Sequence, residues 1–329
     1  MDKVEKRVKV LITGGCGFVG SHVVDWFLQK TDWDLIILDG LTYAGNLNRI
    51  TDLYSYDERR VKFVYHNLRA PINELVASRI GSVDYIFHLA ANSSVEFTLK
   101  NPTITVYDNV MATVNMLDFA RTQPNLKLMN YFSTDEVYGP VSSPGEGFDE
   151  EAPHKPSNPY SAGKAAGEDY CHAYHVTYGV PVFITNAMNI FGFDQHPEKY
   201  IPTVIRKVSE GGNLPVYSSA NGKVAGSRFW IFAYDIADAL LFLHDKAIPG
   251  EKYHIKGTWM DNLDLAKLIA SKIGKPLKYE MFDFHSSRPG HDLHYGLDDT
   301  KLNKMGWTLS IGIDSGLDQI IPHYLSRGV

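Results

Sequence analysis

The stretch Thr13-Gly14-Gly15-Cys16-Gly17-Phe18-Val19-Gly20 decides the fold of this chain. It follows an apolar run that is typical of a buried strand, and it opens a segment with the spacing of a helix. Gly14 permits a tight turn, Gly17 lets the backbone approach a pyrophosphate, and Gly20 lets helix and strand pack closely. The N–H groups that begin such a helix attract phosphate, so the stretch predicts a dinucleotide site.

The position of Asp39 narrows the choice of dinucleotide. It ends the second predicted strand, 19 residues after Gly20, and it is followed by Gly40. A carboxylate there binds the two ribose hydroxyls of NAD and repels the additional phosphate of NADP, which an arginine would neutralise. We therefore predict NAD as the cofactor. The alternative is that Asp39 is only a solvated residue at the end of a strand.

Apolar runs alternate with helical patterns through the first 190 or so residues. This alternation predicts an α/β fold with a doubly wound parallel sheet. We expect strands over 8–13, 35–39, 61–66, 85–90, 127–134 and 181–186, and long helical segments over 103–121 and 161–178. The rest of the chain is rich in Gly, Pro and Asn and has shorter helices, such as 263–273. We expect an NAD-binding domain over 1–190 plus about 228–260, and a smaller, partly interleaved substrate domain over about 191–227 and 261–329.

Composition excludes several classes of protein. Hydrophobic residues make up 44% of the 329 residues and the formal net charge is −6, so neither disorder nor binding to nucleic acid or an anionic membrane is expected. The chain has no apolar run of about 18 residues, and we expect no membrane span. Its two cysteines, Cys16 and Cys171, fit a reducing, cytoplasmic location. No metal site is expected, because the histidines lack metal-binding spacing; His88 is interpreted as a core histidine.

Two further motifs indicate chemistry. Tyr160 and Lys164 lie four apart, so on a helix they share one face, where the ammonium favours the phenolate and lets the tyrosine act as a base. A lone pair with this spacing also occurs on solvated helix faces. The other motif, Ser133-Thr134-Asp135-Glu136-Val137-Tyr138-Gly139, follows an apolar run. Polar residues just past the carboxyl end of a parallel strand lie where ligands bind in such sheets.

With these motifs the chain resembles the extended short-chain dehydrogenase/reductase superfamily, and within it the nucleoside-diphosphate-glucose 4,6-dehydratases, most of all those for dTDP-glucose. The resemblance covers almost the whole chain. Besides the three motifs above, it is carried by residues 41–46, 88–91, 185–186, 197–202 and 288–292. The adjacent acids Asp135 and Glu136 are its specific part, since related sugar epimerases lack the pair.

The resemblance implies an NAD-dependent lyase reaction in three stages: oxidation at C4 of the glucose, elimination of water across C5 and C6, and return of the hydride to C6. Tyr160 would take the O4 proton, Thr134 would steady that oxygen, and Lys164 would hold the tyrosine and the nicotinamide ribose. Glu136 would be the base at C5, and Asp135 the acid that protonates the departing C6 hydroxyl.

The resemblance also implies the binding residues and the assembly. The residues expected around the cofactor are Gly14, Gly17, Phe18, Val19, Gly20, Asp39, Asn67, Leu68, Ala90, Ala91, Tyr160 and Lys164. The residues expected to approach the nucleotide sugar are Asn189, Lys199, Tyr217, Arg228 and Arg288. Segments 103–121 and 161–178 would pair across a homodimer axis.

Departures from the family pattern leave the nucleotide open. The family has Asp-Ile where this chain has Asn67-Leu68, a histidine at the position of Ser94, and an aspartate at the position of Phe229. The loop 218–227 is about four residues longer. UDP-glucose therefore stands as the alternative to dTDP-glucose. A nucleotide-sugar epimerase or decarboxylase is disfavoured by the acid pair, and an NAD-binding regulator without activity is disfavoured by the intact Tyr160 and Lys164.

Overall fold

The computed structural model describes residues 7–42, 44–219, 224–283 and 293–328. The chain divides into two compact units. The first comprises residues up to Thr134, Pro159–Asn186 and Ala237–Tyr253, and the second comprises Asp135–Asn158, Ala187–Ile236 and the residues from His254 on. Among the described residues, no helix is both long and apolar enough to cross a membrane.

A seven-stranded sheet forms the centre of the first unit. Its strand order is β10-β6-β5-β4-β1-β2-β3, and β3, β2, β1, β4 and β5 run parallel. Almost every residue of the inner strands is buried, as expected for a parallel sheet covered on both faces. The strands are β1 (Lys9–Thr13), β2 (Asp34–Asp39), β3 (Val61–Tyr65), β4 (Tyr85–His88), β5 (Leu128–Thr134), β6 (Val182–Ala187) and β10 (Lys252–Ile255).

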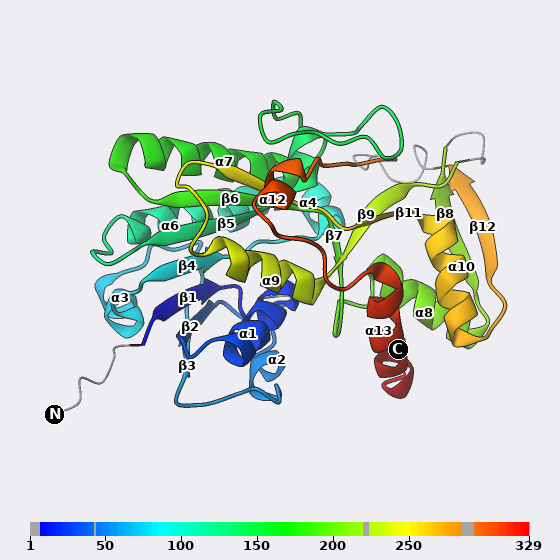
Figure 1. The fold of residues 1–329 in the computed structure, drawn as a ribbon, viewed down its shortest axis with the longest axis horizontal. Helices are drawn as coiled ribbons and strands as arrows, with labels where there is room; N and C mark the ends of the chain where they lie inside the picture. The colour runs from blue at the N-terminus through cyan, green and yellow to red at the C-terminus, as the bar shows by residue number, and fades with distance from the viewer. Residues whose placement is uncertain (1–6, 43, 220–223, 284–292, 329) are drawn as a thin grey trace. The chain divides into compact units, whose positions relative to one another are not determined.

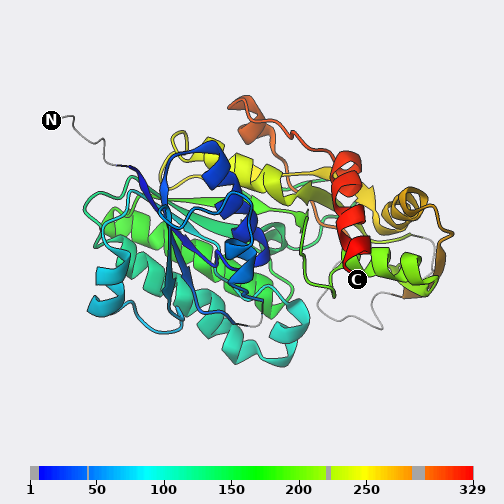
Figure 2. The ribbon, with the colours of Figure 1, turned by 90° about the horizontal axis from the view of Figure 1, so that it is seen from below.

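Helices cover both faces of this sheet. Figure 2 shows α1 and α9 on one side, and α6 and α7 on the other. On the α6 and α7 side, Leu11, Ile86 and Met129 of the strands join Met116 and Leu117 of α6 in one buried cluster. The helices are α1 (Phe18–Lys30), α2 (Asn48–Thr51), α3 (Glu74–Ile80), α4 (Val95–Lys100), α5 (Pro102–Thr105), α6 (Ala112–Ala120), α7 (Pro159–Tyr178) and α9 (Ala233–Leu243).

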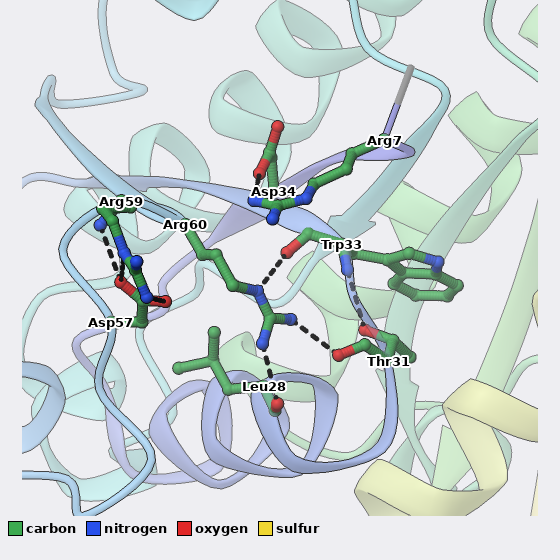
Figure 3. A network of polar contacts seen from close by, with 8 residues as sticks. All are labelled: Arg7, Leu28, Thr31, Trp33, Asp34, Asp57, Arg59 and Arg60. Atoms are coloured by element: carbon green, nitrogen blue, oxygen red, sulfur yellow. Dashed lines mark hydrogen bonds and ion pairs between the residues drawn. The ribbon is translucent and has the colours of Figure 1, made fainter. Parts of the chain in front are cut away.

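Arg60 binds backbone carbonyls at the end of α1 (Figure 3). The Arg60 guanidinium donates to three backbone carbonyls, those of Leu28, Thr31 and Trp33, at 2.8–3.0 Å. The last carbonyls of a helix lack partners within it, so a cation there satisfies them and complements the helix dipole. Arg60 thus positions the helix whose opposite end begins at the glycine turn.

The second unit contains two small sheets and its own core. In one sheet β9 (Ser227–Phe232) pairs with β7 (Asn189–Phe191) in parallel and with β11 (Thr258–Asp261) antiparallel, and in the other β8 (Asn213–Ser218) pairs with β12 (Lys278–Asp283). Residues of α8 (Tyr200–Glu210), α10 (Asn262–Ile273) and α13 (Ile313–Ser326) form one buried apolar cluster with β7, β8 and β9. Figure 1 shows these elements, together with α12 (Thr300–Lys304).

The predicted fold class is confirmed, and two local predictions need correction. The strand expected over 85–90 ends at His88, because Ala90 turns toward Thr13 and its N–H is bound by the Thr13 hydroxyl. The helical segment expected over 103–121 is interrupted by a π-helical turn, η1 (Val106–Met111). The division into an NAD domain and a substrate domain stays a prediction, since packing defines the two units and not what they bind.

Candidate active site

The glycine turn between β1 and α1 has the conformation that the sequence demands. Gly14 has φ +71°, and a β-carbon there would lie 2.8 Å from Ala90. A β-carbon on Gly20 would lie 2.1 Å from the Gly14 carbonyl oxygen, so α1 and the turn approach as closely as glycine alone permits. Gly17, Phe18 and Val19 begin α1 and are only half-buried. Backbone N–H groups at the start of this helix can therefore hold a pyrophosphate.

Asp39 braces this turn from the end of β2. One carboxylate oxygen accepts the Cys16 N–H at 3.0 Å and the other accepts the Leu41 N–H at 2.8 Å. The side chain is 8% exposed, and burial raises the pKa of its carboxyl while the backbone hydrogen bonds oppose that rise. A carboxylate at the carboxyl end of β2, beside the glycine turn, fits the ribose of NAD.

The other residues expected around the cofactor also lie at the carboxyl ends of strands. Asn67 and Leu68 follow β3, where the Leu68 carbonyl accepts the Asn115 amide at 2.7 Å and the Asn67 side chain accepts the Arg69 N–H at 3.0 Å. Ala90 and Ala91 follow β4. The structure thus brings these residues to the edge of the sheet that carries the glycine turn, where an α/β sheet binds ligands.

Tyr160 and Lys164 occupy the first turns of α7, with Tyr160 half-buried and Lys164 3% exposed. The Lys164 ammonium lies over the ring of Tyr131, 4.2 Å from its centroid. Burial lowers the pKa of Lys164 to about 8, while the Glu168 carboxylate opposes that fall. An ammonium in such a site stabilises a phenolate on the same helix face.

Thr134 is the last residue of β5 and is 7% exposed. Its carbonyl accepts the Asn186 side-chain amide at 3.0 Å. This bond fixes the backbone of β5 at the residue expected to steady the substrate oxygen. The first unit therefore holds Thr134, Tyr160 and Lys164 on neighbouring elements, β5 and α7.

Asp135 and Glu136 form the first half of a 3₁₀ turn, η2 (Asp135–Tyr138), which follows Thr134 directly in the chain and belongs to the second unit. Asp135 is 5% exposed and Glu136 is half-buried. The Asn158 amide donates to a Glu136 oxygen at 3.0 Å. The turn is held further on by the Tyr138 hydroxyl, which lies 2.9 Å from the His254 ring nitrogen. The two carboxylates therefore differ in burial, as opposite proton roles require.

Four of the residues expected to bind the substrate, Asn189, Lys199, Tyr217 and Arg228, lie in the second unit. Asn189 pairs with Trp230 of β9, the strand that also carries Arg228. The Arg228 guanidinium donates to the carbonyls of Ser227 and Leu293 at 2.7 Å and lies over the ring of Tyr295. Lys199 precedes α8, and Tyr217 lies in β8. Arg288 lies outside the described residues.

Asn109 is a supporting residue that the sequence pattern did not indicate. It lies in η1, and its side-chain amide exchanges two hydrogen bonds with the backbone of Asn92, at 2.8 and 3.1 Å. The loop after β4, which carries Ala90 and Ala91, is thereby fixed. A π-helical turn adds one residue to the helical repeat and is frequent at functional sites, but helical periodicity does not reveal it. Ser94, at the position where the resemblance implies a histidine, caps α4 by accepting the Phe97 N–H at 3.3 Å.

His88 and Cys16 are structural. His88 is fully buried and its ring nitrogens lie 2.7 and 3.3 Å from the hydroxyls of Thr13 and Thr113. Burial and the nearby Lys164 charge lower its pKa to about 3, so it stays neutral. Cys16 is fully buried and burial raises the pKa of its thiol to about 12, which makes it a poor nucleophile. In the described part of the chain no cluster of three or more His, Cys, Asp or Glu residues has the arrangement of a metal site.

The chain matches a family of known proteins over most of its length. Residues 10–255 match the family described as "NAD dependent epimerase/dehydratase family". A probable dTDP-glucose 4,6-dehydratase of Sinorhizobium fredii is 35% identical over 338 residues, which cover 98% of this chain and 94% of the relative. The dTDP-glucose 4,6-dehydratase of Escherichia coli is 34% identical, over 97% of this chain and 94% of the relative.

A solved structure supports the same relationship. The crystal structure of DesIV, a dTDP-glucose 4,6-dehydratase from Streptomyces venezuelae with NAD and TYD bound, has a TM-score of 0.87 and 32% identity, covering 97% of this chain and 98% of that one. The matching family is described as NAD dependent, and DesIV was crystallised with NAD. On these grounds, the chain belongs to the NAD-dependent epimerase/dehydratase family.

Proposed function

We propose that this protein removes one molecule of water from a nucleoside-diphosphate-glucose, with dTDP-glucose the best substrate, and forms the 4-keto-6-deoxy sugar with a resident NAD. The observation that carries the proposal is the acid pair Asp135-Glu136 directly after Thr134, in a chain that also has Tyr160 and Lys164 on α7. An enzyme that only oxidised and reduced the C4 hydroxyl would need Tyr160 and Lys164 but no acid pair.

The first stage is the oxidation at C4 of the glucose. NAD bound at the glycine turn and Asp39 would accept the hydride from C4 and later return it to the sugar. Tyr160 removes the O4 proton, and the Thr134 hydroxyl donates to that oxygen. Lys164 keeps its positive charge at neutral pH, since its pKa is about 8, and so supports the phenolate of Tyr160.

The second stage is the elimination. The C4 ketone acidifies the C5 hydrogen, which Glu136 removes, and Asp135 protonates the C6 hydroxyl as it leaves as water. Glu136 accepts a hydrogen bond from Asn158, as an ionised carboxylate does, whereas Asp135 is the more buried of the two. Hydride then enters at C6 and a proton returns to C5, so the net change is the loss of one water.

Two substitutions separate these stages. We expect Tyr160→Phe to abolish both, because no hydride leaves while O4 keeps its proton. Asp135→Asn should retain the first stage and slow the loss of water by about 10²–10⁴-fold, the usual contribution of a general acid. Stopped-flow absorbance of the reduced cofactor should show it accumulating in Asp135→Asn. The matched control is Asp149→Asn, an exposed carboxylate. Turnover of Asp135→Asn at the parental rate would remove Asp135 from the acid role.

We expect the enzyme to prefer dTDP-glucose over UDP-glucose only moderately. The dTDP and UDP moieties differ by one methyl on the base and one hydroxyl on the sugar. A methyl in an apolar pocket contributes about 1–3 kcal/mol, so some turnover of UDP-glucose is expected beside that of dTDP-glucose. We assign the diphosphate and sugar contacts to Asn189, Lys199, Arg228 and Arg288, and the base to Tyr217. Arginine suits this task through its paired donors.

We also propose that the protein is a homodimer and that it works in the cytoplasm. The described segments η1 and α7, which the family resemblance places at a dimer axis, carry large apolar side chains exposed by 44–69%. They are Val106, Tyr107, Tyr170, Val176 and Tyr178. Exposed apolar side chains on neighbouring helices favour burial against a second copy. The two cysteines are buried thiols, which agrees with a reducing compartment.

A further inference from the structure

The reaction derived above gives no role to the buried carboxylate of Glu168 on α7. The side chain is 1% exposed. One of its oxygens accepts the Ser133 hydroxyl at 2.5 Å and the Asn186 amide at 2.7 Å, and the other pairs with the Lys252 ammonium at 2.8 Å. A buried carboxylate is costly unless it is paired and hydrogen-bonded in this way. All four residues belong to the first unit.

These contacts join α7 to the end of β5. Ser133 is the residue before Thr134, and the Asn186 amide that donates to Glu168 also donates to the Thr134 carbonyl at 3.0 Å. Glu168 therefore reaches the last two residues of β5, directly through Ser133 and through Asn186. Tyr160 and Lys164 lie two turns and one turn before it on the same helix. One carboxylate thus fixes the spacing between the helix of the expected base and the strand of the expected oxygen donor.

The helix lies especially close to β5 at this point. A β-carbon on Gly167 would lie 2.1 Å from the Tyr131 hydroxyl oxygen, and that hydroxyl donates to the Lys164 carbonyl at 3.1 Å. The ring of Tyr131 lies beneath the Lys164 ammonium. Because α7 packs closely on β5 at Gly167, the charge of Lys164 depends on the groups that pack around it.

Charged and titratable groups from three elements, α7, β5 and β4, surround Lys164. On α7 they are Glu168 and Cys171, with Tyr160 at the start of the helix; on β5 there is Tyr131, and on β4 there is His88. His88 stays neutral, and burial raises the pKa values of Tyr131 and Cys171 well above their ordinary ones. Glu168 is the one carboxylate among these groups, and Lys252 on β10 is its counter-charge.

We propose that Glu168 is a positioning residue of the reaction: it keeps the Lys164 ammonium charged and holds α7 against the end of β5 that carries Thr134. Lys252 sets the strength of this effect by partly neutralising the carboxylate. The effect of Glu168 on turnover depends on the proposed function, whereas its effect on the charge of Lys164 holds whatever the substrate.

Three variants separate the charge of Glu168 from its packing. Glu168→Gln keeps a carbonyl oxygen for Ser133 and Asn186 but removes the charge. Lys252→Met removes the counter-charge at a side chain that is 21% exposed. The double variant Glu168→Gln/Lys252→Met replaces the ion pair with a neutral pair. The matched control is Asp169→Asn, the next residue on α7, which is exposed.

The first readout needs no substrate. In NAD-loaded protein with ¹³Cε-labelled lysine, the Lys164 signal is assigned by its loss in Lys164→Met and followed against pH. Burial already lowers the pKa of Lys164 to about 8. Glu168→Gln should move the midpoint to lower pH by about one unit, and Lys252→Met should move it to higher pH. The double variant should lie between the two, and Asp169→Asn should match the parent.

The second readout is the pH profile of kcat/KM with dTDP-glucose. The loss of activity at alkaline pH should begin at lower pH in Glu168→Gln and at higher pH in Lys252→Met. At pH 8 Glu168→Gln should lose about fivefold in kcat, with KM little changed, because Glu168 does not touch the substrate. Opposite shifts by the two single variants cannot come from a purely structural role, which would lower activity at every pH.

The results separate the possibilities. A Lys164 midpoint that is the same in Glu168→Gln, Lys252→Met and the parent would overturn the proposal. Failure of Glu168→Gln to fold would leave Lys252→Met and the double variant to decide it by the same shifts. Failure of the parent to act on dTDP-glucose, with the midpoint shifts present, would contradict the proposed function and leave the effect of Glu168 on Lys164 standing.

Discussion

The Asp39 carboxylate can act in two ways, through its hydrogen bonds to the backbone and through its negative charge. Its two oxygens accept the backbone N–H groups of Cys16 and Leu41, which fixes the glycine turn. Its negative charge is the feature that disfavours the additional phosphate of NADP. We propose that the same carboxylate shapes the cofactor site and selects the cofactor, and a substitution that preserves its shape can separate the two tasks.

At the residue scale, Asp39→Asn tests the selection. An asparagine keeps one acceptor oxygen for the turn and removes the charge, so the preference for NAD over NADP should fall by about tenfold or more. Asp39→Ala leaves two N–H groups without an acceptor and should also lower the free energy of unfolding by about 1–3 kcal/mol. The measurements are cofactor affinities of stripped protein and urea unfolding, with Asp34→Asn at the start of the same strand as control. An unchanged preference in Asp39→Asn would contradict this account of the carboxylate.

At the scale of the secondary-structure element, the ends of α1 are fixed in different ways. At its start, Gly17 has no side chain, which leaves room for a phosphate. At its end, the Arg60 guanidinium donates to the Leu28 carbonyl (Figure 3). Arg60 directly precedes β3, and it binds the Leu28 carbonyl in the last turn of α1 and the Thr31 and Trp33 carbonyls just after the helix. The helix is thereby stabilised where it does not bind a ligand.

Arg60→Met should lower the free energy of unfolding by about 1–3 kcal/mol, because three carbonyls lose a charged donor together. Arg59→Met is the matched control. Arg59 pairs with Asp57 within one exposed turn, and its side chain is 83% exposed, so its loss should change stability little. Urea unfolding followed by circular dichroism compares the two variants. Equal stability of Arg60→Met and the parent would show that water replaces these three bonds without cost.

Sequence reasoning succeeded where the physical signal is local. The glycine turn, the position of Asp39 at the end of β2 and the buried strands could be predicted because each depends on a few neighbouring residues. It did not find Asn109, because a π-helical turn changes the register without changing the composition. It did not find Glu168 either, since a glutamate four residues after a lysine looks like an ordinary solvated pair. Only the packing of Ser133 and Lys252 around it shows that this carboxylate is buried.

At the scale of the whole molecule, the proposed homodimer gives a direct test. Sedimentation velocity of the parent should show a dimer. Tyr107→Glu combined with Tyr170→Glu should give a monomer, because a buried interface does not tolerate unpaired charges on both helices. Tyr54→Glu is the control, since Tyr54 is fully exposed and lies outside η1 and α7. A parent that sediments as a monomer would contradict the assignment of these helices to an interface.

The central claim is that the protein dehydrates a nucleoside-diphosphate-glucose with an internal transfer of hydrogen from C4 to C6. The most direct measurement uses dTDP-glucose deuterated at C4, with UDP-glucose labelled in the same way as a parallel substrate, and follows the product by mass spectrometry and NMR. We predict loss of one water, deuterium in the new C6 methyl group, and a higher kcat/KM for dTDP-glucose. A higher value for UDP-glucose would overturn the choice of nucleotide and leave the chemistry intact. Recovery of both sugars without loss of water would contradict the account.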